Sequence, residues 1–238
     1  MQPVEHPKSL MEVTAEKIRD AIVSGELPLG LKVSEQRLAD TLGVSRSPVR
    51  DALAAMQSEG LVTISPKRGT FVFTPDLQIV DELCEHRAIL ETAALRIGVR
   101  RNHANLIKQL DLASEAMKRA LDANDPHGYT LGDNQFHNTI VFAAQNRSLA
   151  KSYKLTISPL KALRTHLFTI MNENTDRSMD EHDKITNAIH AKDADMAVSC
   201  LEQHIGHLAE AFRVKLSTED SEQKLLGLQP TQSEGASL

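Results

Sequence analysis

The sequence predicts a mainly α-helical protein with one small β element near its N-terminus. Aromatic residues make up only 3% of the 238 residues and there is no Trp, whereas Ala, Leu, Ile, Glu and Lys are common. This composition favours helices over a β-sandwich. Apolar residues recur at helical spacing through most of the chain, and the spacing changes to every second residue only around 61–73.

The N-terminal part begins with signals for three helices. Residues 10–24 form an amphipathic stretch that Gly25 ends. A short helix follows Ser34 and closes at Gly43. Ser45 can then accept a hydrogen bond from a free N–H in the first turn of a third helix.

A hairpin follows the third helix. The third helix tolerates Pro48 because N–H groups in the first turn have no partner within the helix. After Gly60, the segments "LVTI" and "TFVF" alternate in polarity on either side of "SPKRG", which places Lys67 and Arg68 at the tip. Helix, helix, turn, helix and hairpin together predict a winged helix-turn-helix domain over residues 1–74.

The rest of the chain is predicted to be an all-helical domain with a tail. Residues 75–216 form this second domain, and the polar segment 217–238 is expected to be disordered. A bundle of six helices is expected near 78–101, 103–123, 127–145, 148–171, 178–191 and 193–216.

Composition also limits the compartment and the partners. The net charge of −5 argues against a chain that coats nucleic acid over its whole surface. Cys84 and Cys200 lie far apart, so neither a disulfide framework nor a Cys-based zinc module is expected. There is no signal-peptide pattern and no apolar run of membrane-spanning length. We therefore expect a cytoplasmic protein with no membrane partner.

The third predicted helix carries two arginines on one face. Arg46 and Arg50 lie four residues apart, opposite the apolar positions Val49, Leu53 and Met56. Arginine at the start of such a helix can contact guanine in the major groove or bind phosphate. A solvated basic face is the alternative, but the preceding helices and the basic hairpin tip favour DNA binding.

Four polar residues fall on apolar stripes of three predicted helices: Asp133, His137, His182 and His204. A hydrogen-bonded core histidine is the ordinary explanation for any single one. One carboxylate and three imidazoles that converge in a bundle instead favour a divalent metal ion. Zn²⁺ is the first expectation, with Ni²⁺ and Mn²⁺ as alternatives. Four protein ligands would leave an octahedral ion two positions for a chelating carboxylate.

Two arginines also fall among apolar positions of the predicted bundle, namely Arg87 and Arg164. A guanidinium directed at a core needs an anion beside it. An internal carboxylate such as Glu91 and a bound organic acid are both compatible with the pattern. Both alternatives stay open at this point.

The segment "IRDAIVSGELPLGLKVSEQRLADTLGVSRSPVRDALAAMQSEGLVTISPKRGTFV" resembles the DNA-binding domain of the GntR family of bacterial transcription regulators, and the resemblance covers residues 10–74. Leu29 stands where that family usually has proline, which affects only a turn. The resemblance implies DNA contacts from Arg37, Ser45, Arg46, Ser47, Arg50, Lys67, Arg68 and Gly69.

The helical half resembles the FCD effector-binding domain of the FadR subfamily of GntR regulators, from about 78 to 216. "ELCEHRAILETAAL", "DNQFHNTIVFAAQN", "EHDKITNAI" and "LEQHI" carry the resemblance. It implies metal ligands at Asp133, His137, His182 and His204. Six helices would place the domain nearer the VanR-like branch, and the metal-ligand set makes the acyl-CoA ligand of FadR itself unexpected.

Together these observations predict a transcription regulator, most simply a homodimeric repressor. The dimer would bind a palindromic operator, and a small organic acid bound at the metal and at Arg87 and Arg164 would control it. A metalloenzyme is a second hypothesis, which the lack of an HExxH motif and of a placed nucleophile argues against. A metal sensor without an organic effector is a third.

Overall fold

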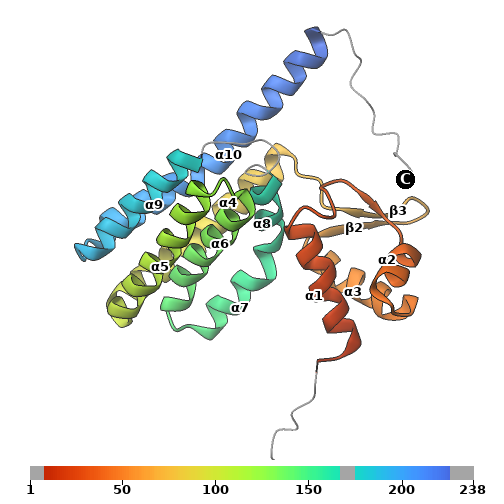
Figure 1. Ribbon diagram of the computed structural model, residues 1–238, viewed down its shortest axis with the longest axis horizontal. Helices are drawn as coiled ribbons and strands as arrows, with labels where there is room; N and C mark the ends of the chain where they lie inside the picture. The colour runs from red at the N-terminus through yellow and green to blue at the C-terminus, as the bar shows by residue number, and fades with distance from the viewer. Residues whose placement is uncertain (1–7, 167–174, 226–238) are drawn as a thin grey trace, which may run out of the picture. The chain divides into compact units, whose positions relative to one another are not determined.

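The computed structural model describes residues 8–166 and 175–225 (Figure 1). The chain divides after Thr74 into two compact units, and the second unit begins at Pro75. The predicted fold class is confirmed, because a helical unit with a small sheet is followed by a unit built from helices in its described residues.

The first unit has the predicted order of helices followed by a hairpin. Its elements are α1 (Leu10–Val23), β1 (Lys32–Val33), α2 (Glu35–Leu42), α3 (Arg46–Ser58), β2 (Val62–Ser65) and β3 (Gly69–Val72). A capping box between Ser9 and Glu12 starts α1. The stripe of α3 is buried as predicted, and Val49, Leu53 and Met56 are at most 1% exposed. This burial makes the opposite face of α3 the exposed one.

The sheet contains a third strand that the sequence did not reveal. Strand β1 pairs antiparallel with β3, with Lys32 opposite Phe71, and the strand order is β1-β3-β2. A strand of two residues is too short to show an alternating pattern. The predicted two-stranded hairpin was therefore correct but incomplete.

The start of α3 differs from the prediction in one detail. Ser45 occupies the N-cap position, but its side chain makes no capping hydrogen bond. An N-cap side chain bonds the N–H of the second or third helical residue, and the third here is Pro48, which has no N–H. Proline thus stiffens the first turn of α3 and also removes one of the two possible donors to Ser45.

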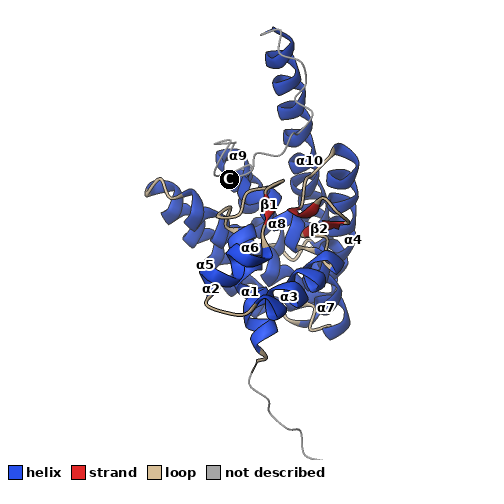
Figure 2. Cartoon of the chain, turned by 90° about the vertical axis from the view of Figure 1, so that its right-hand side faces the viewer, coloured by secondary structure: helices blue, strands red, loops and turns tan. Residues whose placement is uncertain are grey.

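The second unit is a bundle in which α6 packs against both α4 and α5 (Figure 2). α9 packs against α5, and α10 packs against α4 and α9. The helices are α4 (Leu77–Arg101), α5 (His103–Asp122), α6 (Pro126–Ala143), α7 (Arg147–Thr156), α8 (Ser158–Thr165), α9 (Thr175–His190) and α10 (Ala194–Leu225).

The prediction of one helix over 148–171 was wrong. The chain forms α7 and α8 with a break at Ile157, because Pro159 cannot donate a hydrogen bond to the carbonyl of Leu155 and its ring crowds that turn. Residues 167–171 lie outside the described part. The described residues of the second unit therefore form seven helices and not six, so the helix count gives no support to the VanR-like branch.

The last helix is longer than predicted. The backbone of α10 continues through 217–225, where a disordered tail was expected. This segment, "STEDSEQKL", contains neither Gly nor Pro and is rich in residues that tolerate a helix. The remaining tail, 226–238, lies outside the described residues. Within the described chain, no helix is both long and apolar enough to cross a membrane.

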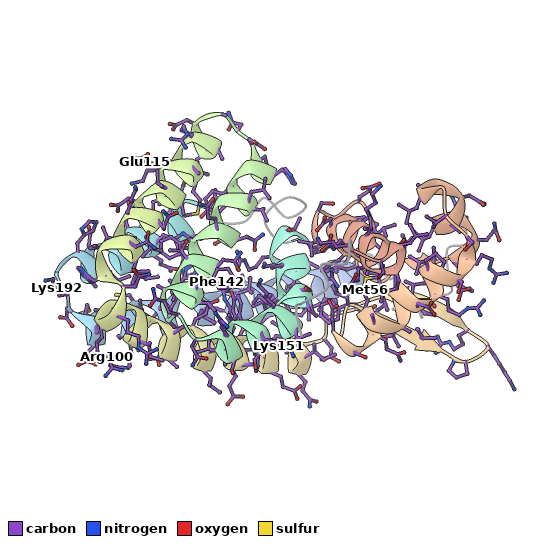
Figure 3. All side chains as sticks on the ribbon, turned by 90° about the horizontal axis from the view of Figure 1, so that it is seen from below. Met56, Arg100, Glu115, Phe142, Lys151 and Lys192 are labelled. Atoms are coloured by element: carbon purple, nitrogen blue, oxygen red, sulfur yellow. The ribbon has the colours of Figure 1, made fainter. Side chains whose placement is uncertain are left out.

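Two glycines allow the helices around α6 to approach closely, and Figure 3 shows the side chains that the other positions carry. A Cβ placed on Gly98 of α4 would lie 2.9 Å from the Cβ of Ala143 on α6. A Cβ on Gly132 would lie 2.6 Å from Cγ of Met117 on α5. Any side chain at these positions would push α6 away from its neighbours.

We expect Gly98→Ala to lower the free energy of unfolding by about 1–3 kcal/mol, because overpacking at Ala143 outweighs the higher helix propensity of alanine. Gly206 is the matched control, since it is an exposed helical glycine whose added Cβ would meet nothing within 4 Å. Gly206→Ala should raise stability by about 0.5–1 kcal/mol. Urea unfolding measures both, and equal effects in the two variants would contradict the close approach.

Candidate metal centre and nucleic-acid interface

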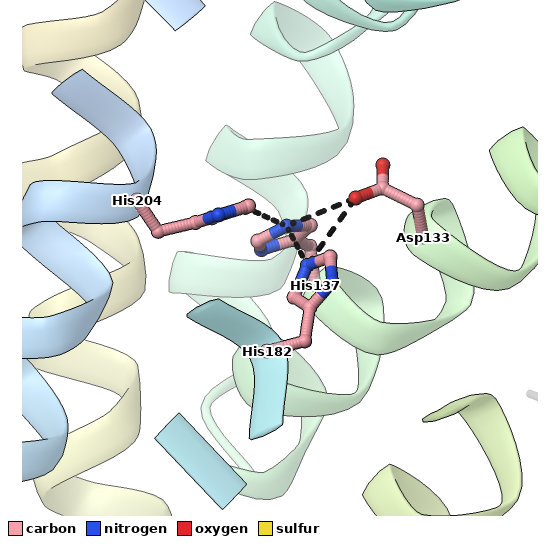
Figure 4. A group of neighbouring side chains, drawn as sticks. All are labelled: Asp133, His137, His182 and His204. Atoms are coloured by element: carbon pink, nitrogen blue, oxygen red, sulfur yellow. Dashed lines mark hydrogen bonds and ion pairs between the residues drawn. The ribbon is translucent and has the colours of Figure 1, made fainter. Parts of the chain in front are cut away.

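Four buried side chains converge inside the second unit. Asp133 and His137 come from successive turns of α6, His182 comes from α9 and His204 from α10 (Figure 4). One ligand atom from each residue can be chosen so that all four lie within 4.8 Å of one another. Their exposed fractions are 9% or less. The structure therefore brings together the four residues that the helical spacing predicted.

The separations between these atoms fit ligands of one metal ion. Nε2 of His137 lies 3.2 Å from Nε2 of His204 and 3.4 Å from Nε2 of His182. Oδ1 of Asp133 lies 3.3 Å from Nε2 of His182 and 3.5 Å from Nε2 of His137. Two ligands bound tetrahedrally to zinc at about 2.0–2.1 Å lie roughly 3.3–3.4 Å apart. These four separations, 3.2–3.5 Å, lie close to that value, and the remaining pairs of ligand atoms lie within 4.8 Å.

Two carboxylates contact the Nδ1 atoms of two of the imidazoles, on the side of each ring opposite Nε2. Oε2 of Glu91 on α4 lies 2.8 Å from Nδ1 of His137, and Oε2 of Glu181 on α9 lies 2.9 Å from Nδ1 of His204. An ionised carboxylate only accepts, so each Nδ1 must donate its proton. In a neutral imidazole the proton on Nδ1 leaves Nε2 as a bare acceptor. This is the arrangement by which carboxylates orient metal-binding histidines.

Electrostatics favour the same protonation states. Burial raises the pKa of the Glu181 carboxyl, but His204, His207 and Arg177 beside it outweigh burial and lower its pKa to about 2. Burial lowers the pKa of His137 and of His204, so both rings are neutral at pH 7. Two bare Nε2 atoms then face each other at 3.2 Å with no proton between them. A cation among them would turn this repulsion into attraction.

His182 is oriented differently from the other two histidines. Its ring is fully buried and contacts Phe136, with 4.4 Å between ring centroids. Its Nδ1 is buried with no hydrogen-bond partner among the described residues. Burial and the neighbouring His137 lower its pKa well below the usual value. Packing, rather than a carboxylate, thus holds this imidazole.

Arg87 pairs with an internal carboxylate, Glu91, which was one of the two alternatives that the sequence allowed. Its Nε donates to Oε1 of Glu91 at 2.8 Å, and the hydroxyl of Tyr153 on α7 donates to the same oxygen at 2.7 Å. Burial alone would raise the pKa of Glu91, but Arg87 and His137 lower it below its usual range. Nη2 of Arg87 remains buried with no hydrogen-bond partner among the described residues. Arg87 is therefore satisfied on one side only.

Arg164 lies beside the cluster of Asp133, His137, His182 and His204. Its Nη2 forms an ion pair with Oδ2 of Asp133 and lies 3.3 Å from Oδ1 of Asn134. Its Nη1 is buried and makes no hydrogen bond within the described part of the chain. The structure thus places Arg164 next to one of the four cluster residues, with a donor left for a further acceptor.

The predicted DNA-reading face of α3 is exposed. Arg46 and Arg50 expose 56% and 63% of their side chains, and Ser47 is exposed between them. Arg37 on α2 is also exposed. Both α3 arginines lie close to Glu35, the first residue of α2, which the sequence analysis did not single out.

The hairpin tip is a tight turn with a basic surface. The N–H of Arg68 donates to the carbonyl of Ser65, and Lys67 takes a positive φ of 66°. Gly69 has a φ of 113°, and a Cβ there would lie 3.0 Å from Cε of Lys32 on β1. The third strand therefore adds a cation to the predicted basic tip. No periodic signal could have located Lys32 there, since β1 has only two residues.

A winged helix-turn-helix unit followed by a helical bundle with a buried ligand cluster defines a class of DNA-binding transcription regulators. A family model described as "Bacterial regulatory proteins, gntR family" matches residues 10–72, and one described as "FCD domain" matches residues 82–207. The chain belongs to the GntR family of bacterial regulators and carries an FCD domain. Its members and relatives are transcription regulators and not enzymes, which removes the metalloenzyme hypothesis.

Similar proteins agree with this assignment. The "Gluconate operon transcriptional repressor" of Bacillus licheniformis is 30% identical over 197 residues, which cover 79% of each chain. The "Probable D-xylose utilization operon transcriptional repressor" of Paenarthrobacter nicotinovorans is 29% identical over 80% of this chain and 85% of its own. The solved structure of "E. coli McbR/YncC" has a TM-score of 0.76 at 19% identity, covers 88% of this chain and all of its own, and shares the fold.

We expect Glu181→Gln to weaken Zn²⁺ binding about 10- to 100-fold, because the variant loses the charge that orients His204 and makes it more basic. Competition with a chromophoric chelator measures the affinity. Glu202→Gln, which removes the same charge at an exposed position of α10, should bind zinc as the wild type does. Equal zinc affinity in the Glu181 variant and the wild type would argue against this orienting role.

Proposed function

We propose that this protein is a cytoplasmic, homodimeric repressor that binds operator DNA and releases it when a small carboxylate binds at a metal centre in the helical unit. One observation carries the proposal: a buried cluster of three imidazoles and one carboxylate lies in a domain joined to a winged helix-turn-helix. The repressor names of two relatives support the direction of control.

Asp133, His137, His182 and His204 are proposed to hold a divalent ion. Three neutral imidazoles and one carboxylate suit Zn²⁺ best, with Ni²⁺ and Mn²⁺ as alternatives. The bound ion would supply positive charge that an anionic effector can contact. The carboxylates of Glu91 and Glu181 support this assignment, because they leave Nε2 of His137 and Nε2 of His204 without a proton.

The proposed effector is a small organic acid, for which a sugar acid is the first candidate because two relatives are named for gluconate operons. Arg164 is the favoured contact, since it pairs with the proposed metal ligand Asp133 through Nη2, and its buried Nη1 has no hydrogen bond among the described residues. Nη2 of Arg87 is likewise buried without a partner among the described residues, although Nε of Arg87 pairs with Glu91. An anion that supplies the missing acceptor to such a buried donor removes the cost of leaving that donor unsatisfied, which makes the free energy of binding more favourable.

In DNA binding, two copies of the first unit would place their α3 helices in successive major grooves of a palindromic site. Proposed contacts are Arg37, Ser45, Arg46, Ser47, Arg50, Lys67, Arg68 and Gly69. The effector can lower operator affinity only through its different affinity for the DNA-competent and DNA-incompetent states. An effector that binds both states equally would have no effect.

Arg46→Ala or Arg50→Ala should weaken binding to a selected operator by about 1–3 kcal/mol and relax base preference at one position of each half-site. The operator can be isolated by selection from a random-sequence duplex library. Arg147→Ala, at the exposed start of α7 in the other unit, is the control and should leave affinity unchanged. Unchanged affinity in both α3 variants would contradict the proposed docking.

Gluconate and other small carboxylates should raise the melting temperature of Zn²⁺-loaded protein, because a ligand that binds only the folded state stabilises it. At 100 times Kd the stabilisation is about 2.7 kcal/mol. Arg164→Ala should abolish the shift caused by the acid.

The same acids should lower the affinity of the zinc-loaded protein for its selected operator. If Zn²⁺ alone changes operator affinity and no acid adds to it, the protein is a metal sensor. If the Arg164 variant keeps the full acid-induced shift, Arg164 has only a structural role.

A further inference from the structure

Glu35 contacts both arginines of the exposed α3 face. Its Oε2 lies 3.2 Å from Nη2 of Arg46 and 3.5 Å from Nε of Arg50. One carboxylate oxygen thus bridges two guanidinium groups from successive turns of the helix. The side chain of Glu35 is only 27% exposed, and its carboxylate lies against the two positively charged guanidinium groups.

The position of Glu35 is fixed by local structure. It is the first residue of α2, directly after the N-cap Ser34, where the positive end of the helix dipole favours a carboxylate. Arg46 and Arg50 alone would repel each other, since like charges four residues apart destabilise a helix. Glu35 offsets this repulsion and brings the two guanidinium groups toward a common point.

This bridge leaves most of the arginine donors available. A guanidinium has five N–H groups, and Glu35 engages a single nitrogen of each arginine. The remaining N–H groups of both arginines are still sufficient for a two-pronged contact to guanine. The carboxylate, by contrast, repels DNA phosphates and competes with them for the arginines. A contact from these arginines to the DNA phosphate backbone is therefore less favourable in free energy than a contact to a base edge.

We propose that Glu35 is a specificity-determining residue, which holds Arg46 and Arg50 for base contact and disfavours their use on phosphate. Selectivity between sequences requires repulsion against the wrong partner as well as attraction to the right one, and Glu35 supplies the repulsion. The inference rests on the proposed reading of DNA by these two arginines.

An ion pair this exposed contributes little to folding, so Glu35 can be changed without loss of the fold. Glu35→Gln removes the charge and keeps the size of the side chain. Glu35→Asp keeps the charge but shortens the reach, so that one carboxylate no longer spans both arginines. Glu26→Gln is the matched control, because Glu26 is exposed in the loop between α1 and β1 of the same unit and its change alters net charge equally.

The experiment uses the full-length protein as purified, with a random-sequence duplex library as probe. The wild type first selects a preferred duplex, and dissociation constants are then measured for this duplex and for a shuffled one. Glu35→Gln should lower the ratio of the two affinities about fivefold to tenfold, chiefly through tighter binding of the shuffled duplex. Glu35→Asp should lower the ratio in the same direction without any change of net charge.

The control variant should tighten binding to both duplexes equally and keep the wild-type ratio. If Glu35→Gln behaves as Glu26→Gln does, the effect is one of charge alone and the inference is overturned, while the proposed function stands. If the wild type enriches no sequence, or Arg46→Ala and Arg50→Ala leave the ratio unchanged, the proposed function fails and this inference fails with it.

Discussion

Two hydrogen bonds that imidazoles donate to carboxylates organise the helical unit. Glu91 on α4 holds His137 on α6, and Glu181 on α9 holds His204 on α10, so each bond ties a pair of helices together. The same bonds fix the proton on Nδ1 and direct an unprotonated Nε2 inward. The packing of these helices and the orientation of the imidazoles therefore depend on the same two hydrogen bonds. Any shift of the helices would also turn the imidazoles away from their common point.

Such a centre is costly to bury unless its charges are matched. Glu91 is balanced by Arg87, and Tyr153 and His137 donate to its two oxygens. Breaking a buried pair by removing one partner typically costs about 3–5 kcal/mol, so the network also restrains where α4, α6 and α7 can lie. Among the described residues, the inward nitrogens of His137 and His204, Nη2 of Arg87 and Nη1 of Arg164 are left without a matching group. These are the groups that a cation and an anion would satisfy together.

The first unit, which binds DNA, differs from the helical unit in where its charges lie. Its core is apolar and its charged groups are at the surface, where they contribute little to stability. The arginines of α3, the cations of the hairpin tip and Glu35 can therefore be tuned for recognition without a large effect on folding. The helical unit has no such freedom, because its functional groups are also part of its core.

The stripes of apolar residues predicted most helices of both units, though not the break between α7 and α8, and they predicted the convergence of Asp133, His137, His182 and His204. They succeeded because a helical period specifies which side chains point inward, even when those side chains are polar. Local backbone details were predicted less well. The break before Pro159 and the missing cap at Ser45 both arise from a proline that lacks an N–H, and both are visible in the sequence once this donor is counted.

The sequence by itself determined the fold class, the family and the inward-facing ligand groups, because these follow from periodicity and from motifs within single elements. Only the tertiary structure decided which groups meet across elements. It paired Arg87 with Glu91, placed Glu181 behind His204, put Lys32 beside the hairpin tip and brought Glu35 between two arginines. The physical reason is that a period specifies the direction of a side chain, whereas its partner depends on how separate helices and strands pack.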